Sequence, residues 1–90
     1  MSKISFQWAV VIARRWRDKH YGNTYHAVDI ELADKMLQSD ITYGYEDHYK
    51  QTVHALLKSK GYDVPDNYFH FLRLDKIRYH VTDVDRRSEL

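Results

Sequence analysis

The sequence predicts an α+β fold, in which a three-stranded antiparallel meander carries one main helix on one face and is joined by a C-terminal strand. Three observations support this prediction. Two runs alternate apolar and polar residues on either side of a Gly-Asn pair, a later run repeats apolar residues at helical spacing, and a final run alternates again. Because 90 residues suffice for one modest core, we expect a single small domain over residues 1–90.

The meander is predicted from three extended segments. The first two, Phe6–Lys19 and Thr24–Leu32, are rich in β-branched and aromatic residues, which favour strands. A third strand, Met36–Tyr43, follows after a short turn and ends before Gly44. Consecutive strands joined by such short turns pair as antiparallel neighbours.

The register of the first two strands depends on the length of the loop between them. A two-residue loop at Gly22 and Asn23 would set Arg17 opposite Val28 and place charge on the apolar face. A three-residue loop, 21–23, instead sets Trp16 opposite Val28, with either Gly22 or Asn23 at positive φ. Since a slip of one residue exchanges the faces, hydrophobic matching selects the three-residue loop, with Trp16 pointing inward.

The main helix is predicted over Glu46–Lys60. Glu46 and Asp47 lie at its start, where carboxylates favour the helix dipole, and Gly61 is positioned to end it. The helix must lie against a sheet because its apolar stripe cannot remain in water on so small a domain. The stripe consists of Tyr49, Val53, Leu56 and Leu57.

The last third of the chain contains a second, shorter element and a strand. The segment 68–74 is ambiguous between helix and strand, and a cap from Asp66 or Asn67 favours a possible second short helix. Ile77–Val84 alternates and predicts the C-terminal strand. The charged tail after it, residues 85–90, is expected to fray.

Composition excludes several classes of protein. The chain has no cysteine, so it has no disulfide and no cysteine zinc site. Its 14 basic and 13 acidic residues nearly balance, so any attraction to nucleic acid must come from local clustering. The longest apolar run, 8–13, is too short to span a bilayer and lacks the features of a signal peptide. We expect a cytoplasmic protein with no membrane partner.

The candidate binding residues are the basic and aromatic side chains of the hairpin. In the selected register the cations and one tyrosine of the hairpin share the outer face of the sheet, with Tyr21 at the tip and two C-terminal arginines expected nearby. Arginine and lysine neutralise phosphates, and tyrosine rings stack on bases. The alternative is a solvated outer face with no partner. The full set is Arg15, Arg17, Lys19, Tyr21, Tyr25, Arg86 and Arg87.

No catalytic or metal signature accompanies this surface. His48 and His54 are six residues apart and so lie on different faces of a helix, and we expect no metal and no cofactor. His26 is expected opposite Asp18 as a cross-strand polar pair. Glu46, Asp47 and His48 could act as general acid and base, but carboxylates at a helix start have a structural explanation. The protein is therefore predicted not to be an enzyme.

Three motifs together resemble a family of small uncharacterised proteins encoded by phages and prophages. They are the hairpin 22–26 (Gly-Asn-Thr-Tyr-His), the helix start 43–49 (Tyr-Gly-Tyr-Glu-Asp-His-Tyr) and the final strand with its basic run, 79–87. The resemblance covers most of the chain and implies a phage or mobile-element setting in a host cell, without implying an activity. Glu46 departs from the family, whose members often have glycine there.

Two functions follow as hypotheses. The first is a non-enzymatic phage-type accessory binding module that engages nucleic acid or a nucleoprotein through the hairpin face. The alternative is a small inhibitor of a host protein, such as a defence nuclease, that uses the same tyrosines and arginines as anchors; the mixed charge favours this one. An exposed sheet edge would also allow two copies to pair as a homodimer.

Overall fold

The computed structural model describes residues 3–44 and 47–90, and these residues have the α+β architecture that the sequence predicts. The strands form one five-stranded sheet with the order β3-β2-β1-β5. The remaining strand, β4, pairs with the first half of β2, whereas β3 pairs with its second half. The elements are β1 (Ala9–Arg17), β2 (Thr24–Glu31), β3 (Met36–Gln38), β4 (Thr42–Tyr43), α1 (His48–Ser59), α2 (Tyr68–Phe71), β5 (Ile77–Val84) and the 3-10 turn η1 (Arg87–Glu89).

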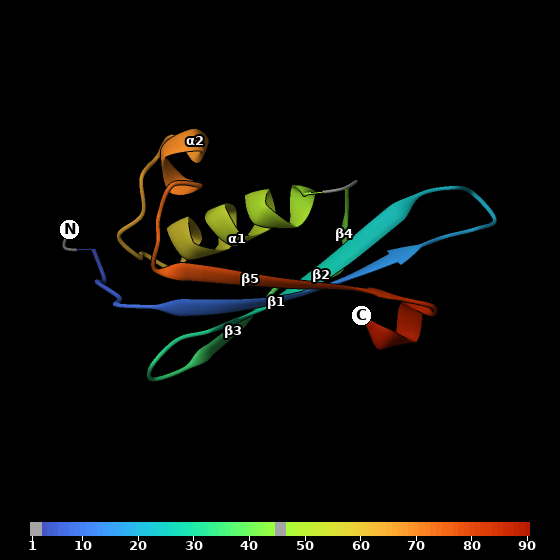
Figure 1. Ribbon diagram of the computed structural model, residues 1–90, viewed down its shortest axis with the longest axis horizontal. Helices are drawn as coiled ribbons and strands as arrows, with labels where there is room; N and C mark the ends of the chain where they lie inside the picture. Colours follow the sequence, from blue (N-terminus) through green and yellow to red (C-terminus); the bar gives the residue numbers. More distant parts are fainter. Residues whose placement is uncertain (1–2, 45–46) are drawn as a thin grey trace.

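The two helices lie on the same face of the sheet, and the core fills the space between them and the strands (Figure 1). Small residues of β1 and branched residues of β2 supply the sheet side of this core, and Val53, Leu57 and Phe71 are fully buried against them. The turn η1 lies on the other side of the sheet, near the end at which the β1–β2 hairpin projects beyond α1 (Figure 1). No helix of residues 3–44 or 47–90 has the length and hydropathy needed to cross a membrane.

The predicted register of the hairpin is wrong, and its error reverses the face of β1. Val28 pairs with Ala13, and Trp16 pairs with Tyr25. The register is therefore displaced by three positions along β1, and a displacement by an odd number exchanges its two faces. Trp16 points away from α1, while Arg15 points towards the helix side of the sheet.

The physical reason is a loop longer than the predicted one. The loop spans 18–23, and Asp18 closes it by donating its backbone N–H to the Asn23 carbonyl at 2.7 Å and accepting the Gly22 N–H at 2.6 Å. A side-chain oxygen of Asp18 also accepts the His20 N–H at 2.9 Å, as in an Asx turn. Gly22 has φ +75°, which confirms the expected positive φ at this position.

The predicted third strand is interrupted by a β-bulge. Gln38 pairs with Asp29 and Thr42 pairs with His26, so the third strand contains one more residue than β2 between these pairs. Ser39 secures the bulge, because its hydroxyl accepts the Val28 N–H at 2.9 Å. The bulge divides the predicted strand Met36–Tyr43 into β3 and β4.

The end of α1 and the start of α2 lie where the sequence predicts them. Gly61, at φ +84°, ends α1 in a Schellman motif, with its N–H bonded to the Lys58 carbonyl and the Tyr62 N–H bonded to the Leu57 carbonyl. Asn67 caps α2 by accepting the His70 N–H at 3.1 Å, so the ambiguous segment begins as a short helix. The predicted helix start at Glu46 lies outside the described residues.

The C-terminal strand β5 pairs with β1 in parallel, with Ala9 opposite Ile77 and Trp16 opposite Val84. The end of β5 therefore lies beside the end of β1, at the hairpin end of the sheet. The charged tail, which the sequence predicts to fray, continues from there and forms the 3-10 turn η1. Parallel pairing thus brings the C-terminal arginines to the end of the sheet that holds the basic hairpin.

Candidate nucleic-acid interface

The face of the sheet opposite the helices carries three aromatic rings in contact. Trp16 and Tyr25 are directly paired across β1 and β2, and their rings stack with centroids 5.8 Å apart and planes 26° apart. Tyr43 on β4 is paired with Tyr25, and these two rings meet edge to face at 5.7 Å. We call Trp16, Tyr25 and Tyr43 the aromatic face.

The aromatic face is accessible to a partner because the helices cover only the opposite side of the sheet (Figure 1). Tyr43 is 50% exposed, and Trp16 and Tyr25 are partly exposed. Ile12, 38% exposed, extends the same side along β1. Contiguous exposed rings of this kind are more typical of a contact surface than of a solvated sheet face, which favours small polar residues.

Two hairpin arginines are held in ion pairs. Arg15, predicted to face outward, lies on the helix side and bonds to Asp83 of β5 at 2.8 Å. Arg14 pairs with Asp29 at 2.9 Å on the open side, where both side chains are at least three-quarters buried. Arg15 is therefore a bridge between β1 and β5, and its predicted position on the outer face is wrong.

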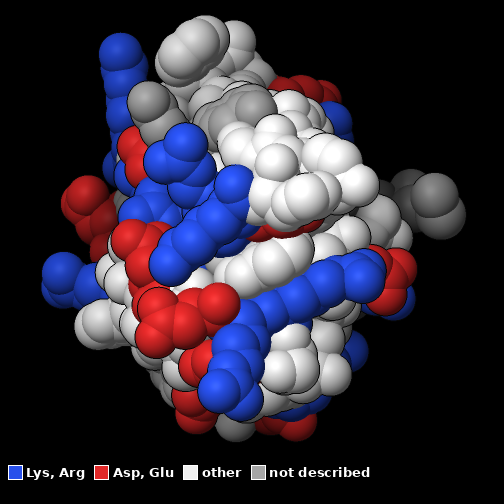
Figure 2. Space-filling model, turned by 90° about the vertical axis from the view of Figure 1, so that its right-hand side faces the viewer, with Lys and Arg blue, Asp and Glu red and all other residues white. Residues whose placement is uncertain are grey.

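The remaining predicted cations gather at the hairpin end. Arg17 ends β1 on the same face as Arg15, so its predicted position on the outer face is also wrong. Lys19 lies in the loop, Arg86 precedes η1 and Arg87 begins it. All four are exposed, and none takes part in an ion pair within the part of the chain that the structure describes. Figure 2 looks onto this end and shows Lys and Arg side chains lying across it, with Asp and Glu side chains between them. We call Arg17, Lys19, Arg86 and Arg87 the cationic end.

The two tyrosines predicted as binding residues lie in different parts of the structure. Tyr25 is the central ring of the aromatic face. Tyr21 is 74% exposed in the loop and contacts only the His20 ring among the described aromatic residues, at 4.5 Å. The site therefore consists of a stacked surface on the sheet and a separate aromatic ring at the loop tip.

The C-terminal turn borders the open face. Leu90 is partly buried and lines one hollow together with Arg14 and Ala27, and Ala27 is only 5% exposed although it points away from the helices. The turn that holds Arg87 thus lies on the same side of the sheet as the aromatic face (Figure 1). A ligand that spans both would contact rings and cations together.

His26 has a structural position under α1, and its predicted pairing with Asp18 is wrong. Its side chain is fully buried, with Nε2 2.6 Å from the Thr52 hydroxyl and with no hydrogen bond to Nδ1 from any described residue. Burial lowers the pKa of His26, and the adjacent His48 imidazole lowers it further, while a backbone interaction with Gly44 opposes the change. The two imidazole centroids are 5.5 Å apart.

The acid and base candidates at the helix start are described only in part. Asp47 is exposed and His48 is partly buried beside His26. Glu46 lies outside the described residues. Within residues 3–44 and 47–90, no group of three or more His, Asp or Glu side chains is arranged to hold a metal ion.

Sequence reasoning missed two of the three rings in the aromatic face. The predicted loop length places Trp16 inward, and Tyr43 is not among the predicted binding residues. The signal that could have found Trp16 is Asp18, because an Asp side chain can bond the backbone two residues on and so begin a turn there. Comparisons with protein-family models, with curated proteins and with solved structures find no significant match to this chain. The resemblance to phage and prophage proteins stays a prediction.

Proposed function

We propose that this protein is a non-enzymatic module that binds single-stranded nucleic acid, with bases stacked on the aromatic face and phosphates held by the cationic end. The observation that carries this proposal is the contact of Trp16, Tyr25 and Tyr43 on the side of the sheet opposite α1 and α2. Aromatic rings on a sheet bind unstacked bases, whereas in a duplex the base faces are occupied by neighbouring bases.

The charge distribution predicts a modest electrostatic contribution. The chain has a formal net charge of +1, so attraction must come from the cationic end and not from the whole molecule. If all four cations contact phosphates, the logarithm of the association constant should fall with the logarithm of salt concentration with a slope no steeper than about −3, at roughly −0.7 per contact. The stacked rings must then supply most of the affinity at physiological salt.

The test is binding of a short fluorescein-labelled oligothymidylate, followed by anisotropy from about 20 to 200 mM salt. Tyr43→Ala removes one exposed ring of the aromatic face and should weaken binding by roughly 5- to 150-fold, the range for one base stack. Phe69→Ala is the matched control, because Phe69 is 71% exposed on α2, on the helix side of the sheet. The Phe69→Ala variant should bind the oligonucleotide as tightly as the wild type does.

The cationic end is tested separately by the salt dependence. Arg87→Ala should reduce the slope by about 0.7 while leaving the effect of Tyr43→Ala unchanged. Duplex of the same length should bind more weakly than the single strand. The proposal fails if the oligonucleotide does not bind at the lowest salt, or if Tyr43→Ala and Phe69→Ala weaken binding equally.

A second candidate function is inhibition of a host protein through the same surface, in the phage setting that the sequence resemblance implies. The mixture of charges at the hairpin end favours it, because acidic side chains lie among the cations (Figure 2) and would repel phosphates. Tyrosine, tryptophan and arginine are also the residue types enriched at protein interface hot spots. Capture of one host protein that survives nuclease treatment and is lost with Tyr43→Ala would favour this function over the first.

A further inference from the structure

A pocket of about 360 Å³ lies at the end of the sheet opposite the hairpin. It is formed by the segment that precedes β1, by the turn that follows β2, and by Tyr62 just after α1. Its volume is at the lower end of the range for small-ligand sites, so it suits one compact chemical group. The aromatic face and the cationic end contribute no residue to it.

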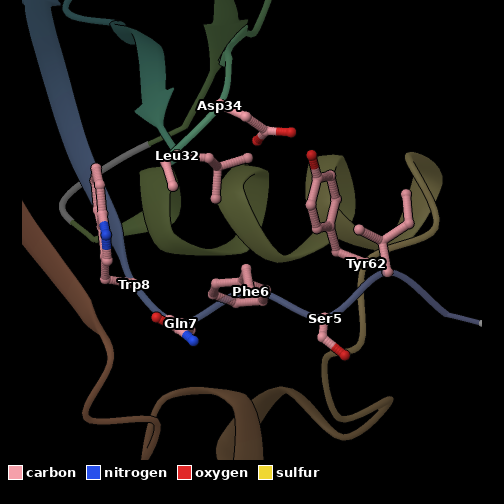
Figure 3. A pocket seen from close by; sticks show the side chains of 9 residues that line it. Ser5, Phe6, Gln7, Trp8, Leu32, Asp34 and Tyr62 are labelled. Carbon is pink, nitrogen blue, oxygen red and sulfur yellow. The ribbon is translucent and has the colours of Figure 1, made fainter.

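Three aromatic side chains bound this pocket. Figure 3 shows Trp8 on one side, Phe6 below and Tyr62 on the other side. Phe6 and Tyr62 meet edge to face at 5.9 Å, whereas Trp8 stands apart from them and is 40% exposed. The faces of such rings carry negative potential and attract cations, tryptophan most strongly.

Two ammonium groups of the chain already lie near these rings. The Lys76 ammonium is 3.9 Å from the centroid of Phe6, where it also donates to the Phe6 carbonyl at 2.9 Å. The Lys35 ammonium is 5.8 Å from the centroid of Tyr62, close to the limit for a cation–π contact. Trp8 has no such cation among the described residues, so its ring remains available to a ligand.

The polar groups of the pocket are also suited to a cation. Tyr62 is only 4% exposed, and its hydroxyl has no hydrogen-bond partner among the described residues. In Figure 3 this hydroxyl and the Asp34 carboxylate lie towards one another at the side of the pocket formed by the β2–β3 turn. A carboxylate accepts hydrogen bonds or pairs with a cation, and an unpartnered buried hydroxyl gains stability from any polar partner.

We propose that this pocket binds a small organic cation, an alkyl-substituted ammonium group, between the rings of Trp8 and Tyr62 and beside the Asp34 carboxylate. Phe6 bounds the pocket, but its ring already holds the Lys76 ammonium. A neutral apolar ligand would contact the rings but would leave the carboxylate and the hydroxyl unused. The Lys35 ammonium would repel the ligand weakly, because Lys35 is exposed and its charge is screened by water. A long exposed side chain of this kind can also move away as the ligand enters.

The test uses choline as the probe and 3,3-dimethyl-1-butanol as its neutral analogue of the same shape. Binding to the full chain is followed by the indole N–H signals of the two tryptophans in a ¹H–¹⁵N correlation spectrum. Choline should shift the Trp8 signal and leave the Trp16 signal unchanged. Its affinity should exceed that of the neutral analogue by about tenfold, within the range for a cation–π contact in a partly desolvated site.

Three variants locate the contributing groups, and each changes an exposed or unpartnered atom. Asp34→Asn keeps the shape and removes the charge, and it should weaken choline binding several-fold without affecting the neutral analogue. Tyr62→Phe removes only the unpartnered hydroxyl, so the protein should fold normally and bind choline less tightly. Lys35→Ala removes the competing ammonium and should tighten binding. Phe69→Ala, remote from the pocket, is the matched control and should bind like the wild type.

The proposal is overturned by any of three results. Equal affinity for choline and the neutral analogue would mean that charge plays no part. A choline-induced shift of Trp16 without a shift of Trp8 would place the binding elsewhere. Unchanged choline affinity in both Asp34→Asn and Tyr62→Phe would show that the polar side of the pocket does not contact the ligand.

Discussion

Protonation of His26 should destabilise the fold between neutral and mildly acidic pH. The side chain is fully buried under α1, and its pKa is lowered from the ordinary value of 6.5. Below pH 6.5 the unfolded chain therefore binds a proton at this histidine that the folded chain does not bind. Stability is fully present above pH 6.5 and is lost as the pH falls towards the pKa of the folded state.

The magnitude follows from this linkage. While only the unfolded state is protonated at His26, the free energy of unfolding falls by about 1.4 kcal/mol per pH unit. Because the unfolded histidine is half protonated at pH 6.5, the loss between pH 6.5 and about pH 5.5 should be at most roughly 1 kcal/mol. Other histidines add their own contributions, so the comparison must be made with a variant at this position.

The assay is urea unfolding across this pH range, followed by tryptophan fluorescence. His26→Gln places an amide near the Thr52 hydroxyl and cannot titrate, so its stability should fall less than that of the wild type over the same range, by up to roughly 1 kcal/mol. Thr52→Val removes the 2.6 Å contact and should lower stability at every pH by about 1 kcal/mol while keeping the wild-type pH dependence. Parallel curves for the wild type and His26→Gln would refute this reasoning.

Three further substitutions, with Phe69→Ala as a control, test the packing and the turns by the same unfolding assay. Gly61→Ala places a side chain at φ +84° in the turn that ends α1, and should cost about 1 kcal/mol. Phe71→Ala empties a fully buried site and should cost about 3–5 kcal/mol, whereas Phe69→Ala on the same helix should change stability by less than about 0.5 kcal/mol. Ser39→Ala leaves the Val28 N–H without its side-chain partner at the bulge and should cost about 1–3 kcal/mol, and no loss would contradict the structure of the bulge.

Local signals in the sequence predict the end of α1 and the start of α2. Gly61 ends α1 and Asn67 caps α2 because each acts on backbone atoms within a few residues. The inward face of β2 is also predicted, because Val28 and Ile30 alternate with polar or small residues. In each case the residue and the atoms that it satisfies are close in sequence, so no tertiary information is needed.

The face of β1 could not be predicted in the same way. Every residue from 8 to 13 is apolar, so alternation gives no face, and the decision rests on the loop. The inward positions are Ala9, Val11 and Ala13, all fully buried, while Ile12 points outward. Hydrophobic matching predicts that the larger side chains of β1, such as Trp16, face the core. In the structure the smaller side chains of β1 face the helices instead.

The candidate site was predicted only in part for related reasons. The clustering of Arg17, Lys19, Arg86 and Arg87 at one end depends on the parallel pairing of β5 with β1, which no local signal specifies. The loss of Arg15 to an ion pair depends on the same pairing, because Asp83 lies directly opposite it. Non-local strand pairing thus decides which basic residues remain available to a partner.

The central claim is that the open side of the sheet is the binding surface, and the two tryptophans report on it directly. Trp16 lies in the aromatic face, whereas Trp8 lies at the opposite end of β1. Titration of the protein with oligothymidylate, followed by the two indole N–H signals, should shift the Trp16 signal and leave the Trp8 signal unchanged. Binding by anisotropy with an unshifted Trp16 signal would contradict the account.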